Sequence, residues 1–380
     1  MRIKHKFAAA AAFLIFVLSC GNSEGGGTQD ATTDNENHLD LNVTDTIGVE
    51  LGHPDYVFGN IVEAQRTADG NVLVLDTSTM NIREFSPEGE MIGSAGRQGT
   101  GPGEFQMPRG MAVLMNDDVL VSDMGANAIS VFSDSLVWME NITGFFPRPP
   151  FIMTAAGDSA VVGMIPAFNR EEGMRGFSIA RLEMESEPSV VYMEEMRPFD
   201  PSMFGPQGAE QEPVFTSDME GRVFIARPGT DAIRINGYLS DGELFLSIDE
   251  RIERVEKTDE EIAEEKEDYE EFTSRSGRRM TRSSDSYDPT PYRRAVTELG
   301  VDAGGRLWVR LGTYRYPYWH VYDTDGRLLF TASLEIDDPD LDDMSFRINE
   351  NGMTAWVPDP ETWPRVFIVE AVETAGPDTP

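Results

Sequence analysis

The chain has 380 residues, 40% of them hydrophobic, which is enough to build one large domain or two small ones. Its 67 acidic side chains outnumber 31 basic ones and give a formal net charge of -36, which repels phosphate backbones and argues against nucleic acid as a partner. Solubility explains this acidity more simply than a specific cationic partner does.

Residues 1–20 have the pattern of an export signal. Basic side chains precede an apolar run at 7–18, which is too short to span a membrane as a helix. The run ends in VLSC, which resembles the lipobox of bacterial lipoproteins, and this resemblance implies a lipid on Cys20, the only cysteine of the chain. A plain cleavable signal with an incidental cysteine is the alternative.

Residues 21–40 are rich in Gly, polar and acidic residues, and they predict a flexible tether. Gly21 stands where an inner-membrane retention signal would carry Asp, so the resemblance to Gram-negative lipoproteins implies the outer membrane. No later apolar stretch has spanning length. We therefore expect an exported protein that is anchored to the cell envelope through its lipid only.

The body of the chain repeats a pattern of strands and turns. VLVLD and NIREFS in residues 66–96 match VLVSD and AISVFS in residues 115–144. Four weaker copies follow the same order, at 151–193, 219–248, 303–334 and 349–372. Repeats of this length with several strands each are typical of β-propellers. The sequence thus predicts an all-β fold over residues 41–373, a six-bladed β-propeller of four-stranded blades, with 374–380 as a disordered tail.

A further strand is predicted at 40–52, ahead of the first copy, where it can pair with the last blade and close the ring. A closed ring leaves only short edges, which suits a monomer. The doubled strand pattern and the segment GRQGTGPGEFQMPRG resemble the NHL-like six-bladed propellers, specifically an exported bacterial group with a GPGEF-type segment. The resemblance covers roughly residues 40–372.

The glycine-rich segment at 96–110 has two interpretations. A phosphate-binding loop would need a following helix and a closing Lys-Ser or Lys-Thr, but strands follow here. The segment is better explained as a structural turn, in which Gly101 and Gly103 permit positive φ angles, Glu104 caps the turn and Phe105 pins it to the core.

Residues 250–288 interrupt the repeats between the fourth and fifth blades. Their first two-thirds are rich in Glu and predict a helix with one apolar stripe, formed by Ile252, Val255, Ile262, Tyr269 and Phe272. A basic patch follows, formed by Arg275, Arg278, Arg279 and Arg282. Two interpretations stay open. The helix lies across the propeller with its stripe buried and its glutamates paired by these arginines, or it is a lid or docking element for a partner.

Propellers carry their functional residues on loops at one end of the central channel. The positions that close the second strand of each blade are Asp76, Asp123, Met164, Arg227, Leu311 and Pro358. They indicate a site of mixed charge or, more simply, decay of the repeat. The aromatic segment at 312–320 can stack sugars or anchor peptides, or it is a blade strand whose aromatics pack against its neighbours. The candidate contacts for a ligand or partner are Arg227, Arg310, Tyr314, Tyr316, Tyr318 and Trp319.

Metal sites and catalytic groups are weakly indicated. A zinc site has little support, because His38 lies in the tether and neither His53 nor His320 has a second His or Cys at ligand spacing. Asp338, Asp340 and Asp342 are weak calcium candidates, with a solvated loop as the alternative. We name no catalytic residue and no cofactor. The sequence favours a non-enzymatic module that binds an envelope protein or a small ligand, and a calcium-dependent, lactonase-like hydrolase or lyase using the channel is the alternative.

Overall fold

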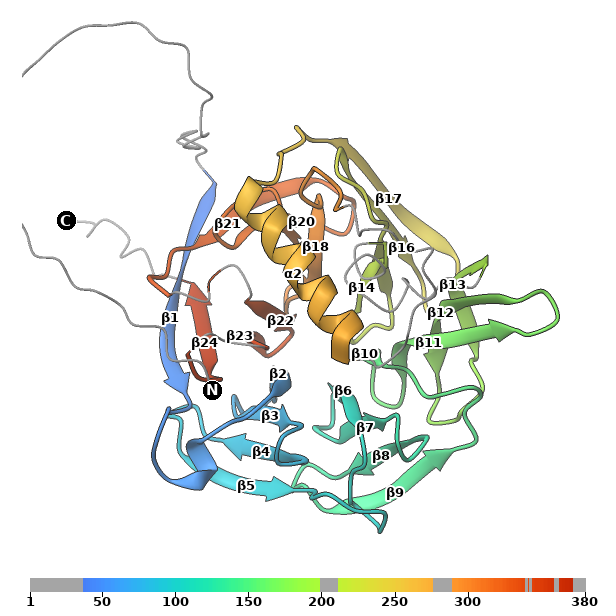
Figure 1. The fold of residues 1–380 in the computed structure, drawn as a ribbon, viewed down its shortest axis with the longest axis vertical. Coiled ribbons are helices and arrows are strands. Elements are labelled where there is room, and N and C mark those ends of the chain that lie inside the picture. The colour runs from blue at the N-terminus through green and yellow to red at the C-terminus, as the bar shows by residue number, and fades with distance from the viewer. Residues whose placement is uncertain are drawn as a thin grey trace, which may run out of the picture. The chain divides into compact units, whose positions relative to one another are not determined.

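The protein is described by a computed structural model. It describes residues 37–198, 211–275, 289–338, 341, 344–358 and 362–371. These residues form four separate four-stranded sheets and one eight-stranded sheet, which consists of two further blades joined side by side. The blades surround a central axis, with the first strand of each nearest to it (Figure 1). The prediction of a six-bladed β-propeller is confirmed.

The blades follow one another in chain order as antiparallel meanders. Blade 1 consists of β2 (Ile61–Arg66), β3 (Val72–Asp76), β4 (Asn81–Phe85) and β5 (Met91–Ala95), and a 3-10 helix, η1 (Pro54–Tyr56), precedes it. Blade 2 consists of β6 (Pro108–Val113), β7 (Val119–Asp123), β8 (Ala128–Phe132) and β9 (Trp138–Thr143). Blade 3 consists of β10 (Ile152–Ala155), β11 (Val161–Asn169), β12 (Met174–Leu182) and β13 (Val190–Pro198).

The second half of the ring repeats this arrangement. Blade 4 consists of β14 (Val214–Ser217), β15 (Val223–Ala226), β16 (Ala232–Tyr238) and β17 (Leu244–Arg251). Blade 5 consists of β18 (Val296–Val301), β19 (Leu307–Leu311), β20 (Tyr318–Tyr322) and β21 (Leu328–Leu334). Blade 6 has β22 (Ser345–Asn349), β23 (Gly352–Trp356) and β24 (Val366–Ala371), and it takes its fourth strand from the start of the chain.

That fourth strand is β1 (His38–Ile47), which pairs antiparallel with β24 from Leu41 opposite Ala371 onward. The predicted closure of the ring by a strand that precedes the first blade is therefore confirmed. The first residues of β1 also pair parallel with β21 in blade 5. His38, which the sequence assigns to the tether, instead lies in this sheet, with Nδ1 2.7 Å from Thr331 Oγ1.

The second strands of blades 1 and 2 are buried on both sides because each blade packs between two others. All five residues of β3 and of β7 are buried. Leu73 and Leu75 of blade 1 meet Met111 and Val121 of blade 2 in one hydrophobic cluster. Burial of such a side chain contributes about 1.5–3 kcal/mol. The contacts between blades, rather than one central core, therefore hold the ring together.

One helix, α2 (Asp259–Arg275), lies between blades 4 and 5, as the sequence predicts. It begins later than the predicted insertion, because β17 runs to Arg251 and residues 252–257 stay extended. Those residues bond to residues 289–294 through Lys257 N–H to the Pro291 carbonyl and Arg293 N–H to the Val255 carbonyl. Within the described residues, no helix is long and apolar enough to cross a membrane.

The predicted apolar stripe is therefore only partly a feature of the helix. Ile252 precedes α2 and packs against the cluster between blades 4 and 5, while Tyr269 is buried within α2 itself. Glu261 pairs with Arg293 at 2.8 Å. Arg278, Arg279 and Arg282 lie outside the described residues, as does the Phe272 side chain.

Candidate functional site

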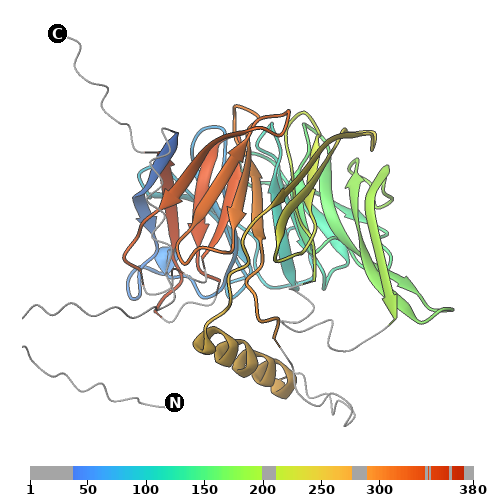
Figure 2. The same cartoon turned by 90° about the horizontal axis from the view of Figure 1, so that it is seen from above.

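One face of the ring carries α2, and we call it the α2 face (Figure 2). Because α2 links the end of β17 to the start of β18, the first strand of a blade begins at this face. In an antiparallel blade the second strand then ends here and the third begins. The turn between β11 and β12 and the loop between β19 and β20 therefore lie on the α2 face, where propellers commonly carry binding residues on loops.

Blade 3 has an elongated hairpin on this face. Strands β11 and β12 have nine residues each, whereas β7 and β8 of blade 2 have five. Met164, which the repeat places at the end of a second strand, lies inside β11 instead. At Gly176 a Cβ atom would lie 1.7 Å from the Glu195 carbonyl oxygen, so glycine lets β12 approach β13 along this extension. The predicted limit of this blade at Met193 is therefore wrong, and β13 runs to Pro198.

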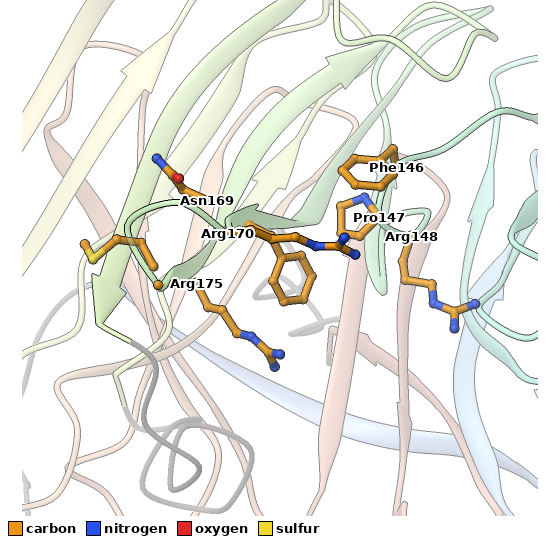
Figure 3. Close-up of a pocket in the computed structure, with 9 residues that line it drawn as sticks. Phe146, Pro147, Arg148, Asn169, Arg170 and Arg175 are labelled. Carbon is orange, nitrogen blue, oxygen red and sulfur yellow. The ribbon is translucent and has the colours of Figure 1, made fainter.

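The hairpin and the connection between blades 2 and 3 enclose a hollow of about 570 Å³, which we call the groove (Figure 3). Its size is in the range of ligand-binding clefts. Phenylalanine and arginine dominate its lining, and no acidic residue contributes to it. The lining residues are Phe146, Pro147, Arg148, Phe168, Asn169, Arg170, Gly173, Met174 and Arg175.

The groove presents apolar rings and cations together. Phe146 is 77% exposed and Phe168 is 38% exposed. The Arg175 guanidinium lies over the Phe168 ring, 4.6 Å from its centroid. Arg148 donates through Nη1 to the Met124 carbonyl at 2.7 Å, which fixes its side chain at the rim. Within the described parts of the chain, neither Arg148 nor Arg170 belongs to an ion pair.

A second hollow, of about 520 Å³, adjoins the groove at the same hairpin. Phe146, Phe168, Asn169 and Arg170 line both hollows. The second hollow continues toward Glu194 and Met196 on β13. The tip of the hairpin is therefore open along two adjoining surfaces rather than enclosing one closed pocket.

The charged side chains of the central channel, by contrast, form ion pairs with one another. Arg347 donates to both carboxylate oxygens of Glu63, with Nε 3.0 Å from Oε1. Arg310 lies 3.3 Å from Glu298, which also accepts the Phe346 N–H. A hollow of about 20 Å³ beside Arg347, lined also by Gln65, Thr154 and Thr216 among others, has room for about one water molecule.

The charges in the channel stabilise one another. Burial raises the pKa of the Glu298 carboxyl, and Arg310 opposes this shift. Burial disfavours the Arg347 cation as well, but Glu63 and, more weakly, Glu298 outweigh it and raise the pKa of Arg347. These carboxylates and guanidinium groups therefore neutralise one another across blades 1, 5 and 6.

The predicted aromatic contacts pack against one another: Tyr318 and Trp319 lie in β20, and Tyr314 and Tyr316 lie in the loop before it. The rings of Tyr314 and Tyr318 stack at 4.0 Å, and Tyr316 meets Tyr318 edge-on at 6.2 Å. Burial raises the pKa of Tyr314 to about 12, with the neighbouring tyrosines adding to the shift. Trp319 points to the opposite side of β20, where it is 1% exposed and packs against Phe346. The aromatic rings thus pack against neighbouring side chains, but only Tyr318 and Trp319 do so from the predicted blade strand.

The two predicted arginine contacts lie apart from the tyrosines. Arg310 faces blade 6, where it bonds the Met344 carbonyl and lies 4.7 Å from the centroid of Phe346. Tyr314 and Tyr318 instead pack against the cluster between blades 4 and 5. Arg227 is exposed just beyond the end of β15. Arg310 and Trp319 thus point away from the tyrosines.

The repeated aspartates at the ends of β3 and β7 bind the backbone. Asp76 is fully buried and pairs with Arg83 at 3.3 Å. Although burial opposes its ionisation, hydrogen bonds from Ser78, Asn60 and Gly59 lower the pKa of Asp76. Asp123 accepts four backbone N–H bonds, from Gln106, Met107, Gly125 and Ala126. Each aspartate joins the turn after its strand to the connection that enters its blade.

The glycine-rich segment is a compact connection between blades 1 and 2. Glu104 accepts the Gly101 N–H at 2.8 Å and the Arg97 Nε–H at 2.7 Å. Gly103 has a φ of 71°, which glycine adopts without strain. Phe105 is fully buried, 5.8 Å from the ring centroid of Phe132. These hydrogen bonds join groups of the segment to one another, so they stabilise its own conformation.

Of the three weak calcium candidates, Asp338 lies within the described residues. Asp338 accepts two hydrogen bonds from Arg365 Nη2, at 2.5 and 2.6 Å, so its carboxylate is already neutralised. Asp340 and Asp342 lie outside the described residues. In the described part of the chain, no group of three His, Cys, Asp or Glu residues is placed to hold a metal ion.

No protein-family model and no curated protein matches this chain. Solved structures resemble its fold at low identity. A Bacteroides fragilis protein classed as exported is 11% identical, with a TM-score of 0.48 over 88% of this chain and 100% of that one. A gluconolactonase from Xanthomonas campestris is 13% identical, with a TM-score of 0.42 over 86% and 98%. A streptogramin B lyase is 12% identical, with a TM-score of 0.40 over 82% and 79%. At these identities the likeness concerns the fold alone.

Proposed function

We propose that the protein is a non-enzymatic interaction module of the cell envelope, exported and held there by a lipid on Cys20. Its binding site is the groove on the α2 face, and its ligand is another envelope protein. The observation that carries this proposal is the lining of the groove, where exposed phenylalanines stand with three arginines and no acidic residue on a chain of net charge -36.

The composition of the groove is that of an interface. Phe, Met and Arg are enriched at the centres of protein interfaces, and a few such residues carry most of the binding free energy. Phe146 and Phe168 offer large apolar area with few rotatable bonds. Two neighbouring loops on a rigid ring position them, so little conformational entropy is lost on binding.

The acidic groups described above make structural contacts. Asp76 and Asp123 bind backbone amides, Glu63 and Glu298 pair with channel arginines, and Asp338 pairs with Arg365. Each is held by a structural contact, which supports a role in stability rather than in acid–base catalysis.

Crosslinked pull-down from native envelopes tests the proposal. We expect the unaltered chain to capture a specific partner and the double variant Phe146→Ala with Phe168→Ala to lose it. The matched control is Leu51→Ala, which removes an 87% exposed side chain outside the groove. A partner captured equally by the double variant, with melting curves unchanged, would overturn the proposed site.

The anchor has its own test. We expect the chain with Cys20→Ala to lose incorporation of labelled lipid and to move from the membrane to the soluble envelope fraction. Retention of both lipid and membrane location in this variant would refute lipidation at Cys20.

A further inference from the structure

We propose that the two hollows at the blade 3 hairpin bind an extended acidic segment of a protein partner that alternates carboxylates with apolar side chains. This inference rests on the proposed function and specifies its ligand. Four observations support it: the shape of the two hollows, the positive charge of the groove lining, the contacts that hold the arginines, and the exposed rings.

The shape favours an elongated ligand. The two hollows, of about 570 and 520 Å³, share Phe146, Phe168, Asn169 and Arg170. A molecule that fills both must pass along the tip of the hairpin. A compact small molecule prefers a cleft that encloses most of its surface, whereas an extended peptide fits such an open path.

The charge favours carboxylates. Many arginines elsewhere in the ring pair with acids, as Arg83 does with Asp76 and Arg347 with Glu63. Arg148 and Arg170 belong to no ion pair within the described residues, and both line the groove. A guanidinium binds a carboxylate through two parallel hydrogen bonds, so these side chains suit Asp and Glu of a partner.

The net charge of -36 favours a short ligand segment over a long one. Interactions between exposed charges are largely screened beyond about 8 Å at physiological ionic strength, so a short segment interacts mainly with the groove. A long polyanion such as nucleic acid would extend over the acidic remainder of the surface and be repelled. The groove therefore suits a few carboxylates rather than a continuous charged polymer.

The site is already arranged before binding. The Met124 carbonyl holds Arg148, and the Phe168 ring supports Arg175. Side chains fixed in this way lose less entropy when a ligand binds. The exposed ring of Phe146 lies beside these cations and offers apolar contact to the partner's side chains between its carboxylates.

Fluorescence anisotropy with a labelled synthetic peptide tests the inference. The probe is a repeat of Glu-Phe-Asp-Leu, mixed with the full chain in detergent. Two comparison peptides replace either the acidic residues by Lys or the apolar residues by Ser. We expect only the acidic-apolar peptide to bind tightly, with both comparison peptides weaker by about tenfold or more, as for a loss of about 1.4 kcal/mol or more.

Variants of the protein locate the binding. We expect the double variant Arg148→Ala with Arg170→Ala to bind the acidic-apolar peptide about tenfold more weakly. The salt dependence of this binding should also be smaller. The control Arg327→Ala, which removes a 78% exposed arginine side chain elsewhere, leaves the affinity unchanged. Equal binding of the lysine peptide, equal binding of the serine peptide, or an affinity insensitive to the double arginine variant would each overturn the inference.

The two proposals fail separately. If an envelope partner is lost with Phe146→Ala and Phe168→Ala but the acidic-apolar peptide does not bind, the groove is an interaction site with a different ligand. If no partner depends on these two phenylalanines, the proposed function itself fails.

Discussion

Two connections between neighbouring blades lie on the same face of the ring and differ in what their side chains contact. In the connection from blade 1 to blade 2, Glu104 bonds the Gly101 amide and Arg97, and Phe105 is fully buried. In the connection from blade 2 to blade 3, Phe146 is 77% exposed and Arg148 lines an open groove. The first connection satisfies its own groups, while the second presents them to solvent.

This difference separates structural loops from candidate binding loops. Both connections are rich in residues that attract attention in a sequence, namely glycines in one and phenylalanine, proline and arginine in the other. Only the contacts tell them apart. A loop whose polar groups bond within the chain stabilises the ring, and a loop that exposes rings and cations is available to a partner.

The largest effect expected from this comparison is on stability. The substitution Phe105→Ala should lower the free energy of unfolding by about 3–5 kcal/mol, because it leaves a cavity beside Phe132. Urea unfolding followed by tryptophan fluorescence measures this change. Phe146→Ala in the other connection should change it by less than about 0.5 kcal/mol. Comparable losses in both variants would erase the distinction between the two connections.

A smaller loss is expected from the aspartate that anchors the closed connection. Asp123→Asn removes a charge that accepts four backbone N–H bonds, so we expect a loss of about 2–3 kcal/mol. Asp134→Asn changes an exposed acid in the same blade and should have almost no effect. Should the two variants unfold at the same urea concentration, Asp123 has no structural role of this kind.

The smallest expected effect is on the pH dependence of folding stability, and it concerns His320, which is also bonded within the chain. His320 Nδ1 lies 3.1 Å from the Tyr322 hydroxyl, which donates to Glu250. Burial lowers the pKa of His320 in the folded chain, and Glu250 opposes the shift. Below the ordinary histidine pKa of about 6.5, the unfolded chain therefore binds a proton that the folded chain does not. This contribution to stability is present above about pH 6.5 and is lost as the pH falls.

We accordingly expect His320→Gln to flatten the fall in urea midpoint between about pH 7.5 and pH 5.5, relative to the unaltered chain. His53→Gln is the matched control, because its side chain is 69% exposed. An unchanged pH dependence in His320→Gln would mean that this histidine does not couple protonation to folding.

Much of the ring is predictable because its signals are local. The match of VLVLD to VLVSD reflects strands buried on both faces, which every propeller blade requires. The insertion of a helix between blades 4 and 5 follows from its composition. The residue at which α2 starts does not follow from composition. Residues 252–257 are held outside the helix by backbone hydrogen bonds to a segment more than thirty residues further along the chain. The likeness to NHL-like propellers stays a prediction.

The site was not predictable in the same way. The FFPRPP stretch and the Phe168–Arg175 hairpin carry no repeat and no motif, and they meet only because β11 and β12 are elongated. Conversely, the aromatic composition of residues 314–318 predicts contacts to a ligand. In the structure the tyrosine rings pack against one another instead. Composition alone does not reveal whether an aromatic side chain faces a neighbour or solvent.

The pairing of β1 with two blades has a mechanical consequence. Any pull that reaches the ring from the chain ahead of residue 37 enters through β1, and it first loads the short parallel ladder from His38 to Leu41 against β21. The longer antiparallel ladder to β24 holds the remainder of the strand. The first ladder can therefore open under load and lengthen the attachment while the second keeps the ring closed.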